Sequence, residues 1–187
     1  MKLNLITALA IIITVSTASA QSVNIGIKGG LNVYTLSGNS DATYDPKASF
    51  HVGLLGHIHV VQHFAIQPEV VFSSQGTKYG NDLKLNLNYI NVPVLFQYMF
   101  DNGFRLQAGP QAAFLVSAKS NDLDVKDNVK GVELGVSIGA SYVNPPTGWG
   151  VDARFNQGIT DITESNSSES YNRGFQLGVF YLFKHKS

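Results

Sequence analysis

The side chains that could do chemistry in this 187-residue chain share one repeating register. Three cations and three anions fall at the polar positions of segments in which apolar residues alternate with other residues. They are Lys28, Glu69, Arg105, Glu133, Asp152 and Arg154. A buried charge without a partner costs on the order of several kcal/mol. We therefore expect these six residues to form a buried ion-pair network. Lys28, Glu69 and Arg154 are each the sixth residue of their segments, so we expect these three to meet in the middle.

Three histidines offer a second candidate chemistry. His57 and His59 lie two residues apart on one extended segment, and His51 shares their register. Two imidazoles at this spacing could share a metal ion. However, His51 lies about 20 Å from His57 at the rise of a strand. We interpret the three histidines as polar interior residues and expect no metal ion and no other cofactor.

Catalytic patterns do not emerge from the remaining residues. We identify no nucleophile elbow and no Ser/His/Asp set. The chain has no cysteine, which excludes disulfides, thiol nucleophiles, zinc–thiolate sites and a lipidated N-terminal cysteine. We expect that the protein is not an enzyme.

The composition points away from an ordinary water-soluble domain. Charged residues make up 14% of the chain, against about 25% in soluble domains. Glycine occurs 18 times, and aromatic residues reach 11%. The formal net charge is zero, which gives no electrostatic attraction for nucleic acid. These values favour a β protein whose surface does not face water.

The first twenty residues have the features of a secretory signal peptide. Lys2 supplies the positive charge, residues 3–15 form the apolar stretch, and residues 18–20 read Ala-Ser-Ala, a pattern typical of a cleavage site. We expect residues 1–20 to be removed, and residues 21–187 to form one domain.

Eight segments of period two follow one another along the rest of the chain. The ranges are 23–34, 49–60, 64–75, 85–100, 104–117, 130–143, 149–159 and 171–183. The connections alternate between short turns and longer polar stretches near 35–48, 76–84, 118–129 and 160–170. Outer-membrane barrels have short periplasmic turns and longer extracellular loops. The pattern predicts an all-β fold, an eight-stranded antiparallel up-and-down transmembrane β-barrel with both chain ends in the periplasm.

Side-chain volume decides which face of the strands points to lipid. The interior of an eight-stranded barrel is only wide enough for side chains to fill it. Phe96, Val136 and Leu177 belong to a register rich in bulky apolar residues, whereas Lys28 and Arg154 belong to the register that holds many of the glycines. We predict that the bulky register faces lipid and the other register faces the lumen.

Aromatic residues of the bulky register gather at the predicted periplasmic ends of the strands. They are Phe64, Tyr98, Phe100, Phe104, Tyr142, Trp149, Tyr181 and Phe183. Barrels carry such rings of aromatic side chains at the membrane interface. We expect these eight residues to form a periplasmic-side aromatic girdle.

Several short motifs resemble one known family. They read GIKGGLN at 26–32, IQPE at 66–69, NYINVPV at 88–94, LQAGPQ at 106–111, VDARFN at 151–156 and GFQLG at 174–178. In order and spacing they resemble the outer membrane protein β-barrel domain family that includes PorT-like proteins. The resemblance covers the chain after residue 20. It implies an eight-stranded barrel of the OmpA transmembrane type and suggests a link to protein secretion. Many barrels end on the final aromatic residue, whereas here residues 184–187 follow Phe183.

Together these observations predict a monomeric outer-membrane barrel with a plugged polar interior. Its expected role is structural, or lies in surface interaction through the extracellular loops. Its expected partners are outer-membrane lipid and a protein at the extracellular loops or the periplasmic rim, without nucleic acid. Two alternatives stay open: a soluble periplasmic lipocalin-like carrier of an apolar ligand, and a small porin-like channel.

Overall fold

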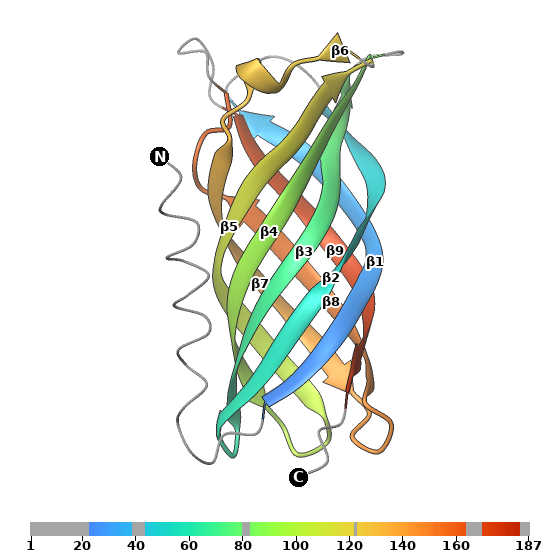
Figure 1. Ribbon diagram of the computed structural model, residues 1–187, viewed down its shortest axis with the longest axis vertical. Helices are drawn as coiled ribbons and strands as arrows, with labels where there is room; N and C mark the ends of the chain where they lie inside the picture. Colours follow the sequence, from blue (N-terminus) through green and yellow to red (C-terminus); the bar gives the residue numbers. More distant parts are fainter. Residues whose placement is uncertain (1–22, 39–43, 80–82, 122, 164–169, 184–187) are drawn as a thin grey trace.

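Eight long strands close into one antiparallel barrel (Figure 1). The computed structural model describes residues 23–38, 44–79, 83–121, 123–163 and 170–183. The expected signal peptide lies outside these residues. The strands are β1 (Val23–Gly38), β2 (Tyr44–Val61), β3 (Phe64–Tyr79), β4 (Leu83–Met99), β5 (Phe104–Ser120), β7 (Val132–Val143), β8 (Trp149–Gly158) and β9 (Ser170–Leu182). Each pairs with its neighbour in sequence, and β1 pairs with β9, which closes the ring.

The two ends of the barrel differ in their connections. The turns after β2, β4 and β7 are short and lie together at one end, at the bottom of Figure 1, which we call the short-turn end. Gly103 and Gly148 have positive φ angles of 89° and 79° in two of these turns, a conformation that glycine adopts without steric cost. The other end, the long-loop end, carries the two-residue strand β6 (Leu123–Asp124) and the 3-10 helix η2 (Lys126–Asn128). Among the described residues, no helix has the length and apolar composition needed to cross a membrane.

The predicted strands are confirmed, with extensions at the long-loop end. Strands β1 to β4 continue through much of 35–48 and 76–84, which we expected to be loops. Polar residues can continue a strand there because ladder hydrogen bonds do not depend on side-chain polarity. One strand is shorter than expected, since the segment predicted to begin at residue 130 begins at Val132. Gly131 lies two residues before Glu133 and would share its lumen-facing side, but it precedes the strand and is exposed.

The predicted orientation of the two faces is also confirmed. Phe96 and Leu177 are 57% and 64% exposed on the outside, whereas Lys28 and Arg154 are 3% and 4% exposed. Large apolar side chains cover the outer wall on every long strand described. A soluble protein rarely exposes an apolar surface of this extent. The outer wall is therefore built for contact with hydrocarbon.

Glycines in the lumen register make room for long polar side chains. Gly30 and Gly178 lie opposite each other on β1 and β9. A Cβ atom added to Gly30 would lie 2.9 Å from Cε1 of His51, and one added to Gly178 would lie 3.0 Å from Nε2 of the same ring. Larger residues at these positions would therefore displace the histidine.

The interior is layered. Towards the short-turn end, the lower apolar layer is formed by Leu55, Val143, Phe180 and Leu182. Towards the long-loop end, the upper apolar layer is formed by Leu36, Leu87, Tyr89, Ala113, Leu115, Ala118 and Ile162. Buried polar and charged side chains fill the middle. The sequence analysis expected a polar interior throughout and did not identify the two apolar layers.

Candidate functional site

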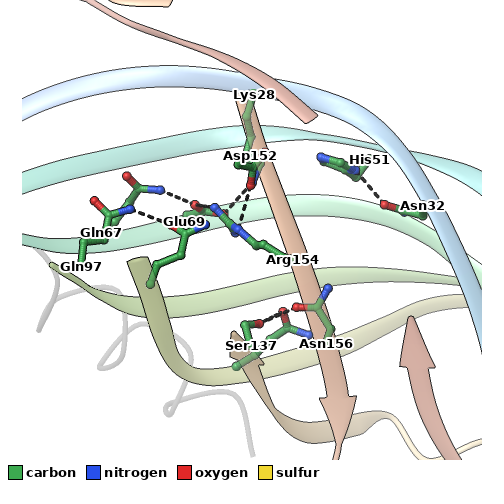
Figure 2. Close-up of polar contacts among 12 residues, drawn as sticks. Lys28, Asn32, His51, Gln67, Glu69, Gln97, Ser137, Asp152, Arg154 and Asn156 are labelled. Carbon is green, nitrogen blue, oxygen red and sulfur yellow. Dashed lines mark hydrogen bonds and ion pairs between the residues drawn. The ribbon is translucent and has the colours of Figure 1, made fainter. Parts of the chain in front are cut away.

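Four of the six expected charges meet in the middle of the lumen (Figure 2). Arg154 donates two hydrogen bonds to Glu69, at 2.7 and 2.6 Å. Lys28 donates to Glu69 at 3.3 Å and to Asp152 at 3.0 Å, and Nε of Arg154 lies 2.8 Å from Asp152. We call these four residues the central network.

The central network is electrically balanced and almost fully buried. It holds two cations and two anions, and the side chains are at most 3% exposed. Charge-assisted bidentate pairs of this kind are among the strong hydrogen bonds in proteins. Because strands β1, β3 and β8 each supply a member, the network links opposite walls of the barrel.

Hydrogen bonds that involve uncharged side chains extend from this centre. Gln67 donates to Glu69 at 2.7 Å, and Gln97 donates to Gln107 at 2.7 Å. Asn156 donates to the hydroxyl of Tyr34 at 2.9 Å. Several walls of the lumen are therefore tied together by direct contacts.

Arg105 and Glu133 lie apart from the central network, contrary to the expectation of one network of six. Arg105 is near the short-turn end, where its Nη1 lies 3.5 Å from Nδ1 of His57. Glu133 is near the long-loop end and accepts a hydrogen bond from Asn172 at 3.4 Å. Within the described ranges, neither forms an ion pair. The reason is height, since Arg105 is second in β5 and Glu133 is second in β7, and these two strands run in opposite directions.

The histidines have separate surroundings. Nδ1 of His51 lies 2.7 Å from Oδ1 of Asn32. The ring of His57 packs edge-on against His59, with centroids 4.6 Å apart. In the part of the chain that the structure describes, no group of three metal-ligating side chains could hold a metal ion.

Ser137 is the central residue of a Gly-x-Ser-x-Gly pattern at 135–139 that the sequence analysis did not take up. Its hydroxyl lies in the lumen, where it contacts Asn156 and donates to Gln111 at 3.3 Å. The pattern lies within β7, with no strand-to-helix turn. A nucleophile elbow requires that turn. Ser137 is therefore an interior hydrogen-bonding residue.

Two loops meet over the lumen at the long-loop end, and we call this contact the lid. Lys130 pairs with Asp161 at 2.8 Å, and its backbone N–H donates to the carbonyl of Ile162. Ile162 belongs to the upper apolar layer, and Val125 and Val129 pack against that layer. The lid therefore packs on the upper apolar layer at this end of the barrel.

The charge of Asp161 is fixed by its hydrogen bonds. Partial burial would raise the pKa of this carboxyl group. The hydrogen bond from Lys130 and those from the backbone N–H groups of Ser170 and Thr163 outweigh this effect. As a result, the pKa of Asp161 falls to about 2.

The eight aromatic residues of the expected girdle lie on the outer wall near the short-turn end. Ring contacts connect Phe64 to Tyr98, Tyr98 to Phe100, and Phe100 to Phe104, with centroid distances of 5.1, 5.0 and 5.7 Å. Tyr142 is the ladder partner of Phe104. On the far side of Tyr142, Tyr181 contacts Trp149 at 5.0 Å and Phe183 at 5.3 Å. The amphipathic rings of the tyrosines and of Trp149 in this position suit a membrane interface.

Comparisons with known proteins agree with this architecture. The family described as "Outer membrane protein beta-barrel domain" matches residues 19–164. Neisserial surface protein A superimposes with a TM-score of 0.59 at 13% identity, over 87% of this chain and 99% of that chain. Ail, the attachment invasion locus protein of Yersinia pestis, solved with the heparin analogue sucrose octasulfate, superimposes with a TM-score of 0.52 at 13% identity, over 87% and 99% of the chains. No curated protein matches. At these identities the two structures show a shared fold.

Proposed function

Because the chain belongs to the outer membrane protein β-barrel domain family, we propose that it is a plugged barrel whose function lies at its ends rather than in transport through its lumen. The proposed role is structural, or lies in surface interaction through the extracellular loops, and involves no catalysis. Long loops of outer-membrane barrels face the outside, so the lid would be extracellular and the short-turn end periplasmic.

The observation that carries this proposal is the buried central network across the lumen. The central network joins β1, β3 and β8 through contacts of 2.6 to 3.3 Å. The lower and upper apolar layers lie on the two sides of this network, and the lid packs on the upper layer. A water-filled pathway is typical of barrels with many more strands. The polar contacts across the lumen argue against a small channel. They also argue against the lipocalin-like carrier, because that carrier would need an apolar cup.

Planar-bilayer recording tests the plugged lumen. We expect the purified protein to insert without discrete conductance steps. Heat-modifiable gel mobility of the same sample serves as the control for folding. Steady unitary steps from folded protein would support the small channel instead.

A surface-interaction role draws support from the fold. Ail was solved with a heparin analogue, which is an example of a ligand bound by a barrel of this shape. Cross-linking on intact cells, followed by outer-membrane isolation and identification of attached proteins, would test the role. A partner that belongs to a secretion system would favour the link to PorT-like proteins. Cross-links to lipid alone would favour a structural role for a monomer.

The proposed export uses residues 1–20 as a signal peptide. We propose cleavage after Ala20, which leaves Gln21 as the first residue of the mature protein. Intact mass measurement of protein from the outer-membrane fraction checks this. A mass that includes residues 1–20 would contradict it.

A further inference from the structure

The short-turn end contains a cavity that the proposed function does not use. It has a volume of about 330 Å³ and is open to solvent. Its polar lining comes chiefly from Asn24, His57, His59, His63 and Arg105. We call this cavity the basic mouth.

Arg105 is the unusual member of the basic mouth. It is only 7% exposed, yet no carboxylate among the described residues pairs with it. Its one recorded polar contact is the 3.5 Å approach to Nδ1 of His57. A guanidinium group carries five N–H donors and no acceptor. Most of its donor capacity is therefore unused by the residues that the structure describes.

The contact with Arg105 also sets the tautomer of His57. Arginine can only donate, so Nδ1 of His57 must accept, and the neutral ring carries its proton on Nε2. A doubly protonated ring would place a second N–H against the guanidinium. His57 is thus a neutral neighbour that does not compensate the charge of Arg105.

The rest of the lining does not supply the missing negative charge. Asp101 is the only carboxylate among the described lining residues, and its side chain is 91% exposed and 3.9 Å from His63. It therefore points to solvent at the rim, well placed to interact with His63 rather than with a buried guanidinium. Within the described part of the chain, the ionisable groups that line the cavity are three histidines, one arginine and this rim aspartate.

The shape of the cavity limits what can enter. Val143 and Leu182 of the lower apolar layer also line the cavity, so part of its lining is apolar. Phe100 and Phe183 of the girdle line its outer edge. A compact anionic group can reach Arg105 from this opening, while any attached part would stay at the level of the membrane interface.

We propose that the basic mouth is a binding site for a phosphate group that enters from the periplasmic side and pairs with Arg105. The planar guanidinium fork matches the oxygens of a phosphate in a bidentate arrangement. The phosphate group is either free or the headgroup of a lipid in the adjacent leaflet. The site is independent of the extracellular loops.

Titration of the whole mature protein with inorganic phosphate in a non-ionic detergent tests the proposal, with calorimetry as the readout. We expect saturable binding that weakens at least about tenfold in Arg105→Gln, because a charge-assisted pair is lost. Arg173→Gln is the matched control, since Arg173 is exposed near the opposite end of β9. Equal binding by Arg105→Gln and the parent protein, or no saturable binding by the parent, would overturn the proposal.

A second measurement does not depend on a variant that folds. In the parent protein labelled with ¹⁵N, phosphate should shift the side-chain signals of Arg105 and the ring signals of the mouth histidines, while leaving His51 unchanged. Shifts that spare Arg105 would contradict the site. Competition by short-chain phosphatidic acid in the same detergent identifies the source. Displacement of phosphate supports a lipid headgroup, and retained phosphate supports the free anion.

Discussion

Glu69 carries much of the hydrogen bonding in the lumen. It accepts two bonds from Arg154, one from Lys28 and one from Gln67. If Glu69 loses its charge, the two cations are left with Asp152 as their only anionic partner. Removal of one partner of a buried ion pair lowers the stability by more than the pair contributes to it, because the other charge remains buried without a partner.

We therefore predict that Glu69→Gln lowers the free energy of unfolding by about 3–5 kcal/mol. Urea titration of the folded protein in a detergent or a lipid bilayer measures this, and the slope of the transition checks that unfolding remains two-state. An unchanged midpoint would show that the central network does not stabilise the barrel.

Glu133 offers a matched comparison at similar burial. It has no cation among the residues described, and its recorded hydrogen bond is the 3.4 Å contact from Asn172. A buried charge without a partner destabilises the folded state. We predict that Glu133→Gln leaves the urea midpoint unchanged or raises it. A loss as large as that of Glu69→Gln would mean that burial alone, rather than the ion pairs, explains both effects.

At the scale of elements, each strand has one face for lipid and one for the lumen. Along β7, Ile138 faces outward near the middle of the strand, and Val132 faces outward at its first residue. Lipid cannot hydrate a charge, so the cost of a cation depends on its depth. The two positions therefore separate the effect of depth from that of the substitution.

We predict that Ile138→Arg destabilises the barrel by about 2–4 kcal/mol, whereas Val132→Arg costs about 0–1 kcal/mol. Reversible unfolding in lipid vesicles gives both values. Equal costs at the two positions would argue against a bilayer around the middle of β7.

The lid gives a pH-dependent prediction at the same scale. The pKa of Asp161 is about 2 in the folded protein, below its ordinary value of 3.8. A lowered pKa means that the contribution of Asp161 is present above pH 3.8 and is lost as the pH falls towards 2. Hydrogen exchange of the Lys130 amide, which donates to Ile162, should accelerate relative to strand amides over this range. Asp161→Asn should remove that dependence, and its persistence in the variant would exclude Asp161 as the cause.

At the scale of the whole molecule, the barrel reverses the usual arrangement of a soluble protein. Its bulky apolar side chains are outside, and its charges are inside. Within the interior, the central network lies between the two apolar layers. The two proposed roles use the two ends of the barrel, the lid at one end and the basic mouth at the other.

Much of this architecture could be predicted from the sequence because it depends on local rules. The period of a strand is two, so Phe96 and Gln97 must face opposite sides wherever the strand lies. The narrow interior of an eight-stranded barrel then decides which side is outside. Ser137 shows the limit of motif reading, because only its place within β7 distinguishes it from a nucleophile.

The sequence predicted that Lys28, Glu69 and Arg154 meet, but only the tertiary structure decided which of the other lumen charges join them. Lys28, Glu69 and Asp152 come from three different strands, and their heights depend on tilt and on the register of every pairing between them. The same geometry places Arg105 and Glu133 towards opposite ends, although all six charges share one register in the sequence. Parity along a strand is a local property, whereas height within a closed barrel is a property of the whole ring.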